Sequence, residues 1–145
     1  MKINKFDKSI KDILNSNYYK IPRFQRPYSW LTENVSDFWE DTVVSKEKDY
    51  FIGSIVLFNG GDSASSIVDG QQRMTTIIML LCTIRNMLNS LGYDALALAI
   101  HKLVEREDIN TNLKYVLSTE TSFPYFQEHI MKFGQSAVDV VDVTP

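Results

Sequence analysis

The stretch that decides the fold is Ile67-Val68-Asp69-Gly70-Gln71-Gln72-Arg73-Met74-Thr75-Thr76. It begins β-branched, passes through a glycine and enters a long apolar segment, so it predicts a strand, a tight turn and a helix in direct succession. The helix is expected over residues 74–91, and Gly92 is a natural stop after it. Its first half is apolar on nearly all sides, which predicts a buried, central helix. The expected inward stripe consists of Ile77, Leu80, Leu81, Ile84, Leu88 and Leu91.

The turn and the start of this helix carry groups that can hold a phosphate. The first N–H groups of a helix have no partner within it and carry a partial positive charge, which attracts anions. Gly70 permits a tight turn and the close approach of a ligand to the backbone. Arg73 adds a full charge, and two hydroxyls follow at Thr75 and Thr76. This pattern predicts an anion site at the turn.

A structural alternative explains the same residues without a ligand. In this alternative Asp69 is the N-cap of the helix and the side chain of Gln72 reaches back to it, as in a variant capping box. Arg73 then pairs with an acid of the helix expected over residues 32–44, because an unpaired charge beside an apolar helix is costly. The residues alone favour neither interpretation.

A second motif lies upstream, IPRFQRPYSW at residues 21–30. The charged residues between positions 14 and 31 are Lys20, Arg23 and Arg26, with no acid among them. Arginine suits phosphate because its planar fork donates two hydrogen bonds and stays charged, and Tyr28 and Trp30 can stack on a base or sugar, or simply pack. The alternative is a structured loop whose aromatic rings cover the core, and spacing alone favours it. If the first interpretation holds, both motifs face one shared site.

Working outward, the remaining pattern predicts one α+β domain. Strands are expected over residues 50–58 and 66–68, joined as a hairpin, with an extended segment over 18–23. Helices are expected over residues 3–14, 32–44, 94–106 and 123–133. Residues 110–118 are ambiguous between loop and strand, and residues 137–145 alternate like a strand. An apolar strand at the end of the chain leads us to expect that the natural protein continues beyond it.

Composition narrows the function classes. The chain has 145 residues, 44% hydrophobic and 23% charged, with a net charge of -3, so nucleic acid is not held by bulk positive charge. The single cysteine, Cys82, excludes an internal disulfide and is expected to be buried. One cysteine and two histidines leave no credible zinc site. No apolar run is long enough for a membrane span and no signal peptide is visible, so we expect a cytoplasmic protein with no membrane partner.

The two motifs, with YFIGSIVLF at residues 50–58 between them, resemble the N-terminal domain of GmrSD-type restriction endonucleases and related phage-defence proteins. The resemblance covers roughly residues 6–90, and DGQQR followed by two threonines is its most specific part. It implies a ParB/sulfiredoxin-like α+β fold, in which a small sheet packs on a central buried helix and further helices follow. It also implies a nucleotide-binding core over residues 1–92 and a helical extension over residues 93–145.

The resemblance implies an NTP-binding and NTP-hydrolysing regulatory domain of a DNA restriction or phage-defence system, with NTP and Mg²⁺ as its ligands. The residues implied for catalysis are Asp69, Gln72 and Arg73. Those implied for nucleotide or phosphate binding are Arg23, Gln25, Arg26, Tyr28, Trp30, Gly70, Gln71, Thr75 and Thr76, and metal ligands stay unknown.

Partners and competing functions follow from the same resemblance. The implied partners are DNA and an HNH-type nuclease domain or subunit, because His101 and His129 lie in no HNH pattern. One alternative is a non-catalytic ParB-like module that binds DNA or a partner. A nuclease ranks third, because Asp62 and Asp69 are the only acids between Asp49 and Asp94 and metal-assisted cleavage needs clustered ligands.

Overall fold

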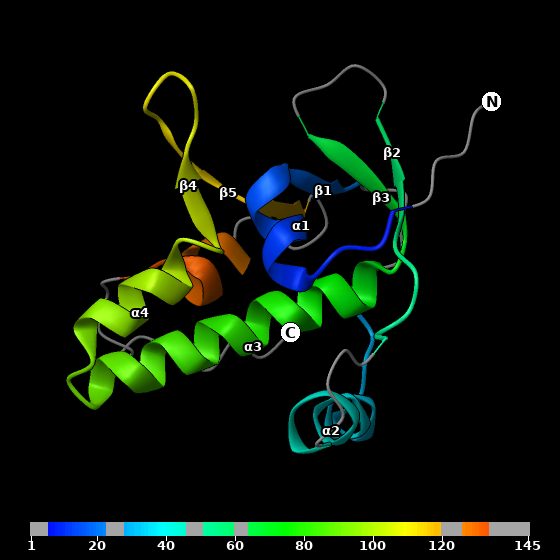
Figure 1. Cartoon of the computed structure of the whole chain (residues 1–145), viewed down its shortest axis with the longest axis horizontal. Helices are drawn as coiled ribbons and strands as arrows, with labels where there is room; N and C mark the ends of the chain where they lie inside the picture. The colour runs from blue at the N-terminus through cyan, green and yellow to red at the C-terminus, as the bar shows by residue number, and fades with distance from the viewer. Residues whose placement is uncertain (1–5, 23–27, 46–50, 60–63, 120–125, 134–145) are drawn as a thin grey trace.

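The computed structural model describes residues 6–22, 28–45, 51–59, 64–119 and 126–133 (Figure 1). The expected α+β fold is confirmed, with a small mixed sheet packed on the long helix α3 (Gln71–Ser90). The other helices are α1 (Ile10–Ser16), α2 (Thr32–Trp39) and α4 (Asp94–His101), with the π-helical segments η1 (Glu40–Val44) and η2 (Phe126–Met131). The strands are β1 (Tyr19–Ile21), β2 (Val56–Phe58), β3 (Ser65–Asp69), β4 (Glu105–Glu107), β5 (Leu113–Tyr115) and β6 (Leu117–Thr119).

The main sheet has the strand order β2-β3-β1-β6. Strand β1 pairs in parallel with both β3 and β6, and β2 pairs antiparallel with β3, so the expected hairpin is confirmed. Parallel pairing brings the carboxyl ends of β1, β3 and β6 to one edge of the sheet. Strand β3 leads from that edge straight into α3, which places the DGQQR motif there.

Strand β2 is shorter than the strand expected over residues 50–58. It begins at Val56, and residues 51–55 have no regular secondary structure. Gly53 has a φ of 108°, and the carbonyls on either side of it, those of Ile52 and Ser54, accept hydrogen bonds from Arg73. This segment is therefore held by α3 and not by the sheet.

The core lies between the sheet and α3. The buried cluster includes Tyr19, Ile21, Ile67 and Leu117 of the strands and Met74, Ile78 and Cys82 of α3. The expected buried thiol is confirmed, because Cys82 is 2% exposed and burial raises its pKa to about 11. The thiol therefore stays protonated at neutral pH and is not a reactive nucleophile.

The inward face of α3 differs from the expected stripe. Its buried residues are Gln72, Met74, Thr75, Thr76, Ile77, Ile78, Cys82 and Arg85. Ile84 is 37% exposed and Leu91 is 66% exposed, so the prediction was wrong for these two residues. Since the first half of the helix is apolar on nearly all sides, its pattern does not say which side meets the sheet. The helix also begins at Gln71, ahead of the expected residue 74.

Leu81 lies at the border of this face, partly buried against the core cluster. Leu81→Ala should lower the free energy of unfolding by about 1–2 kcal/mol, less than the roughly 2–5 kcal/mol of a fully buried leucine. Urea denaturation measures this cost, and Leu91→Ala at the exposed C-cap of the same helix is the control. Equal costs at the two positions would show that Leu81 does not contribute to the core.

The helix expected over residues 94–106 ends early, which corrects that prediction. Helix α4 stops at His101, and β4 follows. Glu105 pairs with Tyr115 across a two-stranded sheet, and the Val116 N–H donates to the Val104 carbonyl at 2.8 Å. Val104 is fully buried, so its backbone carbonyl needs a hydrogen-bond partner inside the protein, and the chain after β5 supplies one. The ambiguous residues 110–118 contain β5 and most of β6.

The other expected helices are confirmed in part. Helix α1 begins at Ile10 because the Ser9 hydroxyl accepts the Asp12 N–H at 3.2 Å and caps it. Helix α2 and η1 together span the helix expected over residues 32–44, but neither contains a buried residue, and Figure 1 shows α2 apart from the sheet and α3. Segment η2 covers part of the helix expected over 123–133, and the expected strand over 137–145 lies outside the described residues.

The chain after residue 92 also contributes to the sheet and the core. Strand β6 pairs with β1, and the core cluster includes Val104, Val116, Phe126 and Met131. The division into residues 1–92 and 93–145 stays a prediction, and the two parts share one sheet and one core cluster.

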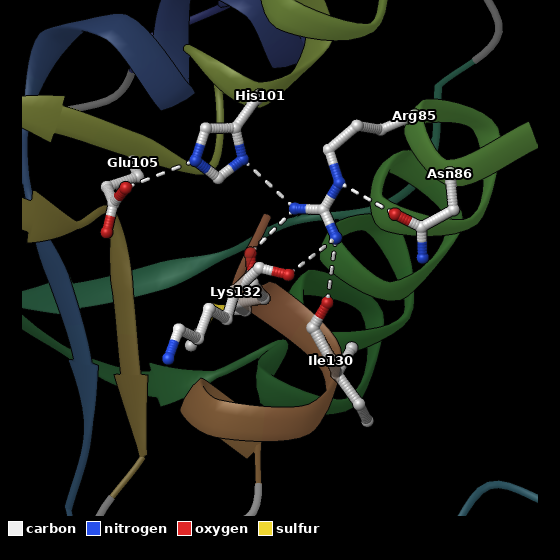
Figure 2. A network of polar contacts seen from close by, with 7 residues as sticks. Arg85, Asn86, His101, Glu105, Ile130 and Lys132 are labelled. Carbon is white, nitrogen blue, oxygen red and sulfur yellow. Dashed lines mark hydrogen bonds and ion pairs between the residues drawn. The ribbon is translucent and has the colours of Figure 1, made fainter. Parts of the chain in front are cut away.

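A buried arginine that the sequence reading did not single out ties three helical elements together (Figure 2). Arg85 of α3 is 0% exposed. Its guanidinium donates to the carbonyls of Met131 and Ile130 at 2.6 and 3.0 Å, and it contacts His101 Nδ1 of α4 at 3.0 Å. The His101 Nε2 in turn lies 3.1 Å from Glu105 Oε1. Burial lowers the pKa of Arg85, and these contacts compensate part of its desolvation.

No helix in the described part of the chain combines the length and the apolar character that a membrane crossing requires.

Candidate functional site

The turn between β3 and α3 is built around Gly70, the N-cap of α3. Its φ of 92° lies in the left-handed region, so the predicted tight turn is observed. A Cβ at this position would lie 3.0 Å from Ile55 Cγ1 and 3.3 Å from both Ile55 Cα and the Ser54 carbonyl oxygen. The close approach that the glycine permits is therefore made by the chain's own segment before β2.

The N-terminus of α3 carries no side-chain cap. Its first helical hydrogen bond runs from the Met74 N–H to the Gly70 carbonyl at 3.0 Å, so the N–H groups of Gln71, Gln72 and Arg73 have no acceptor within the helix. The alternative in which Asp69 caps the helix is wrong, because Gly70 is the N-cap and Asp69 is exposed at the end of β3. The helix has 20 residues, and its aligned peptide dipoles give this end a partial positive charge.

Arg73 connects the helix to the segment before β2. Its Nη1 donates to the carbonyls of Ile52 at 3.2 Å and Ser54 at 3.1 Å. A Cβ on Gly53 would lie 2.1 Å from the same Nη1, so a larger residue at this position would displace the guanidinium. The partners found for Arg73 among the described residues are thus carbonyls, and not the acids of α2 that the structural alternative requires.

The two sequence motifs meet at the first turns of α3. The Ser29 N–H donates to Gln72 Oε1 at 2.9 Å, and the Tyr28 hydroxyl lies 2.8 Å from Thr76 Oγ1. Gln72 is 8% exposed and Thr76 is 1% exposed, so these contacts are mostly shielded from water. Tyr28 and Ser29 of the upstream motif thus contact the first turns of α3, whereas Arg23, Gln25 and Arg26 lie outside the described residues. That the two motifs form one ligand site stays a prediction.

Several predicted site residues have structural partners. Trp30 packs edge-on against Phe38 of α2, with ring centroids 5.7 Å apart. The hydroxyls of Thr75 and Thr76 each donate at 2.8 Å to the carbonyl four residues earlier in α3. A threonine hydroxyl that donates in this way keeps its oxygen lone pairs as acceptors. Gln71 is half-buried at the first helical position.

Two contributions to the site were missed by sequence reasoning. The Ser29 N–H and the carbonyls of Ile52 and Ser54 act through the backbone, so their residue types carry no signal for the contact. For the two carbonyls, the sequence does carry a local signal, which is Gly53 in an otherwise strand-like apolar run. A glycine in such a run often marks the close approach of another group.

The described residues contain no group of three or more His, Cys, Asp or Glu side chains placed to hold a metal ion. Asp69 is the described carboxylate that adjoins the first turn of α3.

No curated protein matches the chain. The family model described as the GmrSD restriction endonuclease N-terminal domain matches residues 10–138, which include both motifs and β6. Because this match spans most of the 145 residues, the chain belongs to the GmrSD restriction endonuclease N-terminal domain family.

Proposed function

We propose that this domain binds a nucleoside triphosphate at the turn between β3 and α3 and hydrolyses it to regulate DNA cleavage. The observation that carries the proposal is the contact of the two motifs at an uncapped helix N-terminus, through Ser29 and Gln72 and through Tyr28 and Thr76. A helix N-terminus offers several N–H donors and a partial positive charge to one phosphate group. The upstream motif brings the aromatic side chain of Tyr28 to the same helix end.

Arg73 supports the proposal through its charge and its remaining donors. Within the described residues, both hydrogen bonds of this guanidinium are donated by Nη1. Nε and Nη2 are therefore left as donors for a phosphate. A guanidinium stays protonated, so Arg73 cannot act as a general base. Its proposed role is to hold phosphate and to stabilise the charge that develops during hydrolysis.

The other two proposed catalytic positions have different tasks. Gln72 positions the upstream motif against the first turn through Ser29. Asp69 is an exposed carboxylate beside the turn, so it can orient water or reach a cation. Magnesium in nucleotide sites is held by one or two carboxylates together with the phosphates, and Asp69 can supply one such carboxylate.

Titration of the purified domain with ATP, GTP, CTP and UTP, with and without Mg²⁺, tests binding by calorimetry, and phosphate release tests hydrolysis. Binding of at least one triphosphate is expected. Absence of binding to all four would contradict the proposal and favour the alternative of a module that binds DNA or a partner subunit. The proposed DNA and HNH-type nuclease partners are tested separately, by comparing DNA cleavage by the complete system with and without the nucleotide that binds.

Arg73→Ala should weaken nucleotide binding by about 1.5–3 kcal/mol, roughly 10- to 150-fold, the usual value of a hydrogen bond to a charged group. Arg73→Lys should restore only part of the affinity, because an ammonium cannot reproduce the planar fork. Lys102→Ala is the matched control, since it removes one exposed positive charge after α4. If Arg73→Ala lowers the melting temperature but leaves affinity unchanged, Arg73 only holds the carbonyls of Ile52 and Ser54.

A further inference from the structure

The parallel strands of the sheet bring a third segment to the edge where the two motifs meet. Strand β1 runs into the upstream motif and β3 runs into α3 at their carboxyl ends. Strand β6 pairs in parallel with β1, and Ile21 and Thr119 are register partners at the end of both strands. In open sheets, ligands bind outside the carboxyl ends of parallel strands. Thr119 therefore lies at the edge of the sheet where the proposed nucleotide site is found.

Thr119 lies on the sheet face that is covered by the core. Along β6, Leu117 and Thr119 are buried while Ser118 between them is exposed. Leu117 belongs to the core cluster together with Met74 and Ile78 of α3. Adjacent strands are about 4.8 Å apart, so two strand spacings, roughly 10 Å, separate β6 from β3. A nucleoside triphosphate bound at the start of α3 is long enough to extend over this distance.

The hydroxyl of Thr119 is buried without a partner. The residue is 5% exposed, and its Oγ1 has no hydrogen-bond partner within the part of the chain that the structure describes. The buried hydroxyls of Ser65, Thr75 and Thr76 all have partners. A buried hydroxyl without a partner destabilises the fold, and valine, which has the same shape, would avoid that cost.

We infer that Thr119 is a further binding residue for the nucleoside triphosphate, and that its hydroxyl hydrogen-bonds a phosphate or ribose oxygen of the ligand. This inference rests on the proposed function. It extends the site from the two sequence motifs to a third strand end, in the part of the chain after residue 92. The unpaired hydroxyl in the free domain then finds its partner when nucleotide binds.

Thr119→Val tests the inference through the melting temperature of the free domain and the affinity for nucleotide. A purely structural role of the hydroxyl would lower both quantities. Removing an unpaired buried hydroxyl should raise the melting temperature of the nucleotide-free domain, and the same change should weaken nucleotide affinity about three- to tenfold. Thr119→Ser keeps the hydroxyl and should bind as the wild type does. Ser118→Ala, at the exposed neighbouring position of β6, is the matched control and should change neither quantity.

The outcomes separate this inference from the function on which it rests. If the wild type binds a triphosphate and Thr119→Val binds it equally well, the inference is overturned and the proposed function stands. A lower melting temperature for Thr119→Val also overturns it, because the hydroxyl then has a structural partner in the free domain. If the wild type binds none of the four triphosphates, the proposed function fails and the assignment of Thr119 fails with it.

Discussion

Arg85→Met is expected to lower the free energy of unfolding by roughly 3–5 kcal/mol, the largest effect of any change considered for this domain. Methionine approximates the volume of the arginine stem, so the loss comes from unpaired acceptors more than from a cavity. The carbonyls of Ile130 and Met131 and the Nδ1 of His101 lose a donor inside the protein. Each buried acceptor left without a partner costs about 1–3 kcal/mol.

Urea denaturation followed by circular dichroism measures this cost, and hydrogen exchange over residues 126–133 locates it. Protection of η2 should fall more than that of the sheet, because η2 is attached to α3 through this arginine. Arg85→Lys should show an intermediate loss, since an ammonium reaches fewer of the acceptors. Asn86→Ala is the control, because the side chain of this exposed neighbour accepts the hydrogen bond from Arg85 Nε at 3.1 Å and does not contact η2 through any described hydrogen bond. A loss below 1 kcal/mol for Arg85→Met would mean that water replaces the guanidinium at these acceptors.

Gly70→Ala is expected to cost about 2–4 kcal/mol of stability, because two separate penalties add. The first is conformational, since an alanine at a φ of 92° lies in the left-handed region. The second is steric, since the new Cβ would lie 3.0 Å from Ile55 Cγ1 and 3.3 Å from the backbone atoms Ile55 Cα and Ser54 O. Backbone contacts of this kind are relieved only by moving the segment before β2 away from α3.

The chain provides a matched control for the first penalty. Gly92 has a φ of 86°, and a Cβ there would meet nothing within 4 Å. Gly92→Ala should therefore show the conformational cost alone, about 1–2 kcal/mol. The difference between the two variants in urea denaturation gives the cost of the close approach at Gly70. Equal values would show that the segment before β2 moves aside freely.

Local sequence was sufficient for the elements around the decisive stretch. The β-branched run before Gly70 and the long apolar run after it predicted β3, the turn and α3, because the periodicity and backbone preferences of successive residues depend on near neighbours. The hairpin of β2 and β3 was predicted for the same reason. The place of the candidate site, at the N-terminus of α3, was also readable from the sequence.

Partners distant in the sequence were decided only by the tertiary structure. The sequence shows that Arg73 needs a partner, but the carbonyls of Ile52 and Ser54 that fill this role are backbone groups without a residue signature. The end of α4 at His101 was missed because pairing of β4 with β5 and burial of Val104 override local helix preference.

The amino-acid sequence by itself determined the strand, the tight turn and the helix around Gly70, and the family that the chain resembles. Only the tertiary structure decided which side of α3 is buried and showed that η2 and α4 enclose Arg85. It also decided that β6 ends, at Thr119, on the same edge of the sheet as the two motifs. The physical reason is that periodicity and backbone angles are local properties of the chain. The burial of a charge, the pairing of a hydroxyl and the register of parallel strands depend on segments that meet only after folding.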